Sequence, residues 1–193
     1  DQALYAAKGT GRNRFSFFTP ALQEAAQTRV RLTNDLRVAV AQSQFQMVYQ
    51  PIIDLRSGVI RKAEGLIRWH HPVRGLVSPA AFIPVAESSG LIHEIGDWVF
   101  HQVVRQAGAW RSSLNEDFQI SINVSPVQFH QDELKNVSWV AHLESLALPG
   151  SAISIEITEG LLLDASEVVS GKLHGIDLGG VARALPVTVL AFA

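Results

Sequence analysis

Hydrophobic residues along the chain follow two spacings, one typical of helices and one typical of strands. After Pro20, apolar residues repeat at helical spacing as far as Ala41. Runs rich in β-branched and aromatic residues come next, and from the second run on they alternate with helical segments. The pattern predicts helices at residues 21–41, 79–91, 93–110, 126–146 and 161–173, and strands at 45–53, 59–69, 118–124 and 152–158.

Strands that alternate with helices predict an α/β fold with a mainly parallel sheet, either a barrel or an open sheet. The Ser57-Gly58 turn between the first two strands predicts that these two are antiparallel. Gly90 and Gly96 are expected to break the helical stretch around them. Residues 175–193 are small and apolar and show no clear continuation of the strand-and-helix alternation.

Three of the predicted strands have a polar face, because successive side chains of a strand point to opposite sides. Glu64 and Arg68 share a face of one strand, and Asn123 and Glu156 lie on polar faces of the next two. If the sheet closes into a barrel, these oxygens could bind a hard cation such as Mg²⁺ or Mn²⁺, and Arg68 could hold a phosphate. The same faces would equally suit the solvated side of an antiparallel sheet, so the alternation leaves both interpretations open.

Composition narrows the classes of function. The 193 residues suffice for one domain, or one and a fragment, and the net charge of −2 argues against binding a DNA or RNA polymer. The absence of cysteine excludes disulfides and thiolate sites, and fits a cytoplasmic protein. No apolar run is long enough for a membrane span.

The seven histidines do not form a recognisable metal-binding pattern. His70 and His71 are adjacent, and neighbouring residues of a strand point to opposite faces, so a loop or capping role is favoured. The remaining histidines lack the spacing of helical metal ligands: His93, His101, His130, His142 and His174.

Five short motifs occur in the order typical of EAL domains. They are Tyr49–Ile52, Ala63–Trp69, Phe82–Glu87 with Gly90–Ile92, Ile122–Ser125 and Glu156–Glu159. The chain resembles that family over about residues 28–174, and residues 1–14 are similar to the end of a GGDEF (diguanylate cyclase) domain. The expected organisation is a GGDEF tail at 1–18, the N-terminal part of an EAL domain at 19–174 and a tail outside the family at 175–193.

The resemblance implies an incomplete TIM-like (β/α) barrel whose first strand is antiparallel. It implies that the intact parent protein hydrolyses cyclic di-GMP to pGpG with Mg²⁺ or Mn²⁺. By motif position it assigns Glu64, Asn123 and Glu156 as metal ligands and Glu159 as a candidate catalytic residue. The residues that it places against the dinucleotide are Gln50, Leu66, Arg68 and Pro84.

The chain departs from the family pattern in two places. Gly65 stands where the family has alanine, and the Asp-Asp-Phe-Gly motif of the next strand is absent, as are later strands with a catalytic lysine and glutamate. Truncation, recombination or a frame error would explain the loss; residues 187–191 can be encoded so that a neighbouring frame reads Asp-Gly-Phe-Gly.

From the missing motif we expect no useful hydrolysis by this chain alone, and dependence on a homodimer or a partner chain. The alternative is a degenerate EAL module that binds cyclic di-GMP or a partner protein without hydrolysis. A remnant without function is a further possibility. Upstream sensory or cyclase activity and the oligomeric state are not encoded in these residues.

Overall fold

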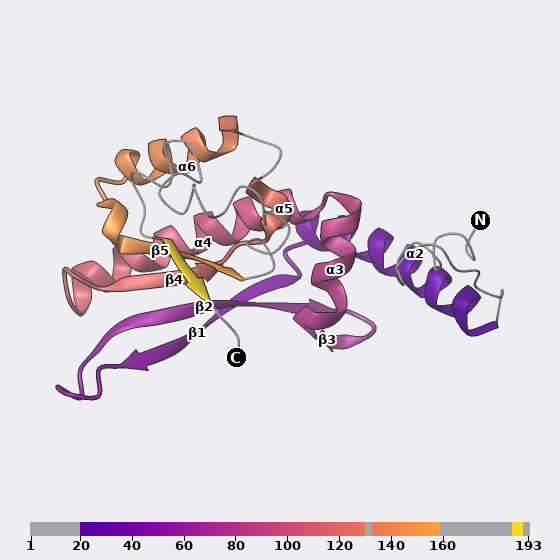
Figure 1. The fold of residues 1–193 in the computed structure, drawn as a ribbon, viewed down its shortest axis with the longest axis horizontal. Coiled ribbons are helices and arrows are strands. Elements are labelled where there is room, and N and C mark those ends of the chain that lie inside the picture. Colours follow the sequence, from indigo (N-terminus) through magenta and orange to yellow (C-terminus); the bar gives the residue numbers. More distant parts are fainter. Residues whose placement is uncertain (1–19, 130–132, 159–186, 191–193) are drawn as a thin grey trace, which may run out of the picture.

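The computed structural model describes residues 20–129, 133–158 and 187–190. Helices and strands follow one another along the chain much as the hydrophobic pattern predicts (Figure 1). The helices are α2 (Pro20–Ala41), α3 (Pro79–Ser89), α4 (Ile92–Ser113), α5 (Pro126–Phe129) and α6 (Glu133–Ser145), with a short 3₁₀ turn at Gly150–Ala152. The strands are β1 (Phe45–Ile53), β2 (Ile60–His71), β3 (Gly75–Val77), β4 (Gln119–Asn123), β5 (Ile153–Thr158) and β6 (Val187–Leu190).

A single mixed sheet organises these elements. Its strand order is β1-β2-β4-β5-β6, with β3 paired to β2 in a hairpin. Strands β2, β4, β5 and β6 are parallel, while β1 runs antiparallel to β2. Figure 1 shows helices α4 and α6 on the same side of this sheet. The predicted α/β fold is therefore confirmed, with an antiparallel first strand and the partial barrel of an EAL-type TIM-like fold.

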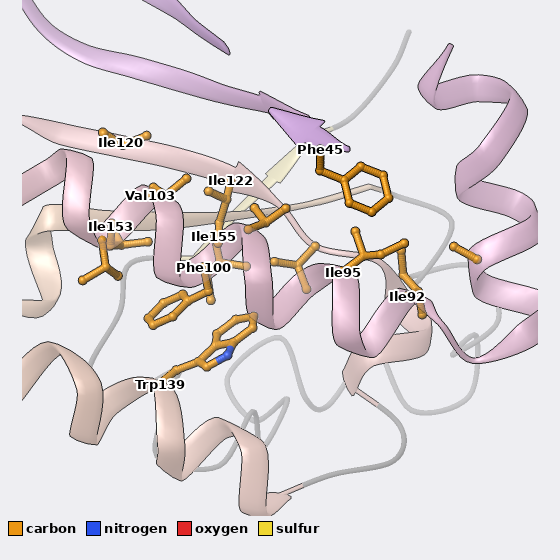
Figure 2. Packing of buried hydrophobic residues seen from close by; sticks show 14 of the residues in the cluster. Phe45, Ile92, Ile95, Phe100, Val103, Ile120, Ile122, Trp139, Ile153 and Ile155 are labelled. Atoms are coloured by element: carbon orange, nitrogen blue, oxygen red, sulfur yellow. The ribbon is translucent and has the colours of Figure 1, made fainter. Parts of the chain in front are cut away.

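The sheet has an apolar face and a polar face. Ile120 and Ile122 of β4 pair with Ile153 and Ile155 of β5, and all four are almost fully buried. Figure 2 shows these isoleucines against helix α4, where Phe100 and its neighbours fill the space beneath the sheet. The alternate residues of the same strands point to the opposite face, which is where the candidate site lies.

Helix α6 packs on the far side of α4 through an aromatic stack. The rings of Phe100 and Trp139 lie parallel, with an interplanar angle of 4° and centroids 4.3 Å apart. Trp139 also donates a hydrogen bond of 3.0 Å from Nε1 to Oδ1 of Asp97. Burial of one large aromatic side chain contributes about 1.5 to 3 kcal/mol, so this stack is a main link between the two helices.

Helix α2 is attached by its second half. Leu32, Leu36 and Ala39 are buried in the core, whereas Val30, two residues before Leu32, is 62% exposed. Asp35 accepts hydrogen bonds of 3.3 and 3.1 Å from Nε and Nη2 of Arg74, in the turn between β2 and β3. The helix thus joins the hairpin at the end of β2 and extends away from it at its N-terminal end (Figure 1).

The two glycines that were expected to break helices behave differently. Gly90 follows α3 with a φ of 77° and donates its N–H to the carbonyl oxygen of Glu87, as helix-ending glycines do. Gly96 lies inside α4, so the prediction of a break there is wrong. The apolar periodicity on either side of Gly96 continues the helix through it, and the absent side chain has another purpose that is described below.

Two further segments differ from the sequence pattern. Residues 187–190 form strand β6, which pairs in parallel with β5, although no strand was predicted in 175–193. His70 and His71 belong to the end of β2, and the capping role expected for the pair is found at His71. Its Nδ1 accepts the backbone N–H groups of Val73 and Arg74, both at 3.1 Å. The helix predicted at 161–173 lies outside the described residues.

Within the described residues, none of the helices is both long enough and apolar enough to span a bilayer.

Candidate functional site

A cavity of about 290 Å³ lies at the carboxyl ends of the parallel strands. Strand residues Leu66 and Arg68 line it, together with Asn123 and Glu156 at the ends of β4 and β5. Residues of helices α3, α4, α5 and α6, of the strands and of the loop after β4 supply the rest of the wall. The carboxyl edge of a parallel barrel is where ligands bind in such folds, because the loops that follow the strands converge there.

Glu64 and Asn123 are in direct contact. Nδ2 of Asn123 donates a hydrogen bond of 2.7 Å to Oε1 of Glu64, although the two residues are 59 positions apart in the chain. They come from adjacent parallel strands, whose register pairs Glu64 with Ser121, two residues before Asn123 on the same face. The antiparallel partner of Glu64 on β1 is Gln50, so Gln50 also belongs to this face.

Glu156 lies next to Asn123 across the β4–β5 ladder. The two residues are register partners, and the backbone N–H of Val124 bonds to the carbonyl oxygen of Glu156 at 3.0 Å. The structure thus brings Glu64, Asn123 and Glu156 onto neighbouring strands, with their side chains on one face.

These three side chains suit a hard divalent cation. Two carboxylates and an amide oxygen form an all-oxygen donor set, which Mg²⁺ and Mn²⁺ prefer, and the half-buried carboxylates favour positive charge between them. Among the described residues, no three His, Cys, Asp or Glu side chains gather around a common point. A cation here would therefore use the amide oxygen of Asn123 besides the two carboxylates.

Of the other expected site residues, some line the cavity and some do not. Leu66 and Arg68 line the cavity, and Nη1 of Arg68 donates to the carbonyl oxygen of Ile67 at 2.9 Å. Pro84 is exposed within α3 and is not among the lining residues, although its neighbour Ile83 is. Glu159 lies outside the described residues.

Gly65, the departure from the family's motif, lines the cavity, and a side chain at this position would point toward the apolar face of the sheet. A Cβ atom at this position would lie 3.2 Å from both Cε of Met47 and Cγ2 of Val103. An alanine methyl group would be tight against these side chains, and this packing explains why glycine is found at position 65. The substitution therefore concerns packing on the apolar face and leaves the position of Glu64 on the polar face unchanged.

The strand next to β5 carries no acidic residue at the level of the site. In β6, the register partner of Glu156 is Thr188. No pair of adjacent aspartates follows Glu156 in the sequence. Among the described strands, β2 and β5 thus supply the candidate acidic donors and β6 supplies none.

Sequence reasoning missed a second group of polar residues at the cavity. Glu87, Ser125 and Gln128 line it, and Glu87 and Gln128 each accept a hydrogen bond from Ser125. Glu87 and Ser125 fall within the motifs noted above, but no role was expected for them. The available signal was Glu87, which directly follows the apolar segment 82–86, because a half-buried carboxylate requires a partner.

The sequence of the chain is similar to those of named bacterial proteins. MucR of Pseudomonas aeruginosa, a bifunctional diguanylate cyclase/cyclic di-GMP phosphodiesterase, is 36% identical over 182 residues, which are 93% of this chain and 26% of MucR. The cyclic di-GMP phosphodiesterase PdeR of Escherichia coli is 36% identical over 168 residues, 87% of this chain and 25% of PdeR. The chain thus spans about a quarter of the length of these curated relatives.

Solved structures of an EAL enzyme and of the MucR phosphodiesterase are also similar to this chain. The MucR phosphodiesterase in complex with cyclic di-GMP matches with a TM-score of 0.70 and 31% identity, over 82% of this chain and 62% of that one. The cGMP-bound EAL enzyme Bd1971 matches with a TM-score of 0.73 and 27% identity, over 89% of this chain and 48% of that one. The family model described as the EAL domain matches residues 33–179. Because that match spans most of the chain and includes Glu64, Asn123 and Glu156, the chain belongs to the EAL domain family.

Proposed function

We propose that this chain is part of a cyclic di-GMP phosphodiesterase, and that its described residues form one side of the metal and substrate site. The observation that carries the proposal is the contact of Asn123 with Glu64, together with the register that puts Glu156 beside Asn123. Relatives named as cyclic di-GMP phosphodiesterases and a relative solved with cyclic di-GMP support this substrate.

Glu64, Asn123 and Glu156 would hold the cation, Mg²⁺ or Mn²⁺. EAL phosphodiesterases are generally dependent on a divalent metal. When bound, such a cation activates water for attack on phosphorus and neutralises the charge that develops on the phosphate. The residues of this chain orient the reactants around it.

Arg68 and Leu66 would bind the dinucleotide. The Arg68 guanidinium lines the cavity two residues beyond Leu66 and on the same face as Glu64, so it can pair with a phosphate bidentately. Leu66 offers an apolar contact for a guanine base. Gln50, beside Glu64 on β1, and Pro84, on α3, belong to the same proposal, although Pro84 would have to contact a part of the ligand that extends beyond the cavity.

Little turnover is expected from the 193-residue chain alone. Thr188 occupies the position beside Glu156 at which a further acidic donor would complete the site, and a threonine hydroxyl is a poor replacement for a carboxylate. Loss of ligands from a catalytic metal site generally abolishes activity. Residues 1–18 are proposed to be the C-terminal tail of a GGDEF domain, residues 19–174 the N-terminal part of the EAL domain, and residues 175–193 a tail outside the family.

The test is release of pGpG from cyclic di-GMP in the presence of Mn²⁺. The intact parent protein, in which the Asp-Asp-Phe-Gly strand and the rest of the barrel follow β5, should hydrolyse the dinucleotide, and Glu64→Ala in it should abolish hydrolysis. The 193-residue chain should bind cyclic di-GMP in calorimetry with little release of pGpG. Absence of turnover by the intact parent protein, or undiminished turnover by its Glu64→Ala variant, would contradict the proposal.

A further inference from the structure

Ser125 is the centre of a hydrogen-bond cluster just beyond Asn123. Its Oγ donates to Oε1 of Glu87, on α3, at 2.7 Å, and its backbone N–H donates to Oε1 of Gln128, on α5, at 3.0 Å. The same Oγ accepts the N–H of Val127 at 3.3 Å. Three hydrogen bonds, one to α3 and two to α5, thus fix Ser125 in the loop that follows β4.

Gln128 reaches Ser125 only because Gly96 has no side chain. A Cβ atom on Gly96 would lie 1.9 Å from Nε2 and 2.9 Å from Cδ of Gln128, far inside van der Waals contact. The Gln128 side chain therefore lies directly against α4 at Gly96. A glycine in a helix interior costs about 1 kcal/mol relative to alanine, and the close approach of Gln128 explains its presence here.

The cluster lies next to the candidate cation ligands. Asn123 is the last residue of β4, and the following residue, Val124, bonds through its N–H to the carbonyl oxygen of Glu156. The backbone just after Asn123 is thus held on one side by β5 and on the other by Glu87 and Gln128 through Ser125. If the Ser125 contacts were lost, the loop could move, and the Asn123 amide with it.

We propose that Glu87 and Gln128 are positioning residues for the cation site, which hold Asn123 beside Glu156 by clamping Ser125. The inference depends on the proposed function, since it assigns these residues to the same site. Neither residue would touch the cation or the phosphorus. Glu87 needs only an acceptor oxygen for this purpose, so a glutamine at position 87 retains the contact and an alanine loses it.

Binding of Mn²⁺ to the full 193-residue chain, followed by electron paramagnetic resonance, tests the proposal. Glu87→Ala and Gln128→Ala should each weaken binding about tenfold or more, as loss of groups that orient metal ligands commonly does. Glu87→Gln should bind like the unmodified chain. The control, Glu144→Ala, removes an exposed carboxylate of α6 and should have no effect.

Hydrogen–deuterium exchange without metal provides a second measurement. Exchange over residues 124–128 should rise in Glu87→Ala and stay unchanged in Glu87→Gln, while α4 remains protected in both. Unchanged exchange and unchanged Mn²⁺ affinity in Glu87→Ala would overturn the positioning role. An equal loss of Mn²⁺ affinity in Glu87→Gln and Glu87→Ala would also overturn it, because the charge of Glu87 and not its hydrogen bond would then be responsible.

The two proposals can fail separately. If the unmodified chain binds Mn²⁺ but Glu64→Ala leaves the affinity unchanged, the cation lies elsewhere and the proposed function loses its basis. If Glu64→Ala weakens binding and Glu87→Ala does not, the function stands and the positioning role falls.

Discussion

The side-chain amide of Asn123 donates to Oε1 of Glu64 at 2.7 Å, and this contact joins two strands whose residues are distant in the sequence. Without a cation, the amide hydrogen offsets the negative charge of Glu64. With a cation, the amide oxygen and the carboxylate can both coordinate it. The pair therefore suits both states of the site, which an acidic residue at position 123 would not.

Asn123→Asp should destabilise the metal-free chain and increase its stabilisation by Mn²⁺. The added carboxylate would face Glu64 and Glu156 without a hydrogen to donate, and like charges at this distance repel. Thermal melting with and without Mn²⁺ measures the effect. Gln42→Glu makes the same amide-to-acid change at an exposed position of the α2 end and should behave identically in both conditions. Equal stabilisation by Mn²⁺ in Asn123→Asp and the unmodified chain would contradict the expectation.

The sequence was sufficient for most of the fold because the strands have strong and different patterns on their two faces. The predicted 45–53 strand coincides with β1 (Phe45–Ile53), since a continuous run of β-formers ends at a clear turn. Strand β6 was missed because its apolar residues follow a long segment without alternation. Gly96 was misjudged since glycine was considered only as a helix breaker, whereas here it makes room for Gln128.

For the site, the sequence indicated the polar faces but not their register. Glu64, Asn123 and Glu156 could be chosen from alternation and family resemblance, yet only the strand pairing places Asn123 beside Glu156. The Glu87–Ser125–Gln128 cluster could not be foreseen, because it joins α3, the loop after β4 and α5 through side chains whose meeting depends on packing.

Phe100→Ala should lower the free energy of unfolding by about 3 to 5 kcal/mol, the usual cost of truncating a buried phenylalanine. Phe100 is fully buried and stacks on Trp139, so its loss leaves a cavity between α4 and α6. Urea denaturation followed by tryptophan fluorescence measures the change. Val30→Ala truncates a side chain that is 62% exposed and should cost far less. A loss below about 1 kcal/mol in Phe100→Ala would show that α6 does not pack as described.

Acidification should destabilise the chain in part through His101. Burial, followed by the nearby charges of His142 and Arg105, lowers the pKa of His101, while Asp97 opposes the shift. A depressed folded-state pKa means that the unfolded chain binds the proton more readily. This contribution to stability is therefore complete above the unfolded pKa of about 6.5 and is lost as the pH falls toward the folded value.

His101→Gln should thus show a shallower loss of stability between about pH 7 and pH 5, because glutamine does not titrate in this range. Urea denaturation at each pH gives the slope. His70→Gln, at an exposed position of β2, is the matched control and should retain the steeper dependence. An unchanged slope in His101→Gln would exclude this histidine as a source of the pH dependence.

Arg74→Ala should change stability by no more than about 1 kcal/mol, the usual range for exposed ion pairs. Its contact with Asp35 is 3.1 Å, but the Arg74 side chain is 41% exposed and therefore screened. The difference between Arg74→Ala and the unmodified chain should shrink further in about 1 M salt. A loss of several kcal/mol would mean that the ion pair, and not the burial of Leu36 and its neighbours, holds α2 in place.

Gly96→Ala should destabilise the chain when Gln128 is present and stabilise it when Gln128 is replaced. In the unmodified chain, a Cβ atom at position 96 would displace the Gln128 side chain and break its hydrogen bond to Ser125. Leaving that buried N–H without a partner costs about 1 to 3 kcal/mol, which exceeds the gain of up to about 1 kcal/mol from alanine in a helix. In Gln128→Ala the hydrogen bond is already lost and the space is free, so only the helical gain remains. Urea denaturation of both single variants and the double variant should therefore give a coupling energy of about 1 to 3 kcal/mol. If the changes in unfolding free energy of the two single variants simply add in the double variant, the Gln128 side chain does not lie against Gly96.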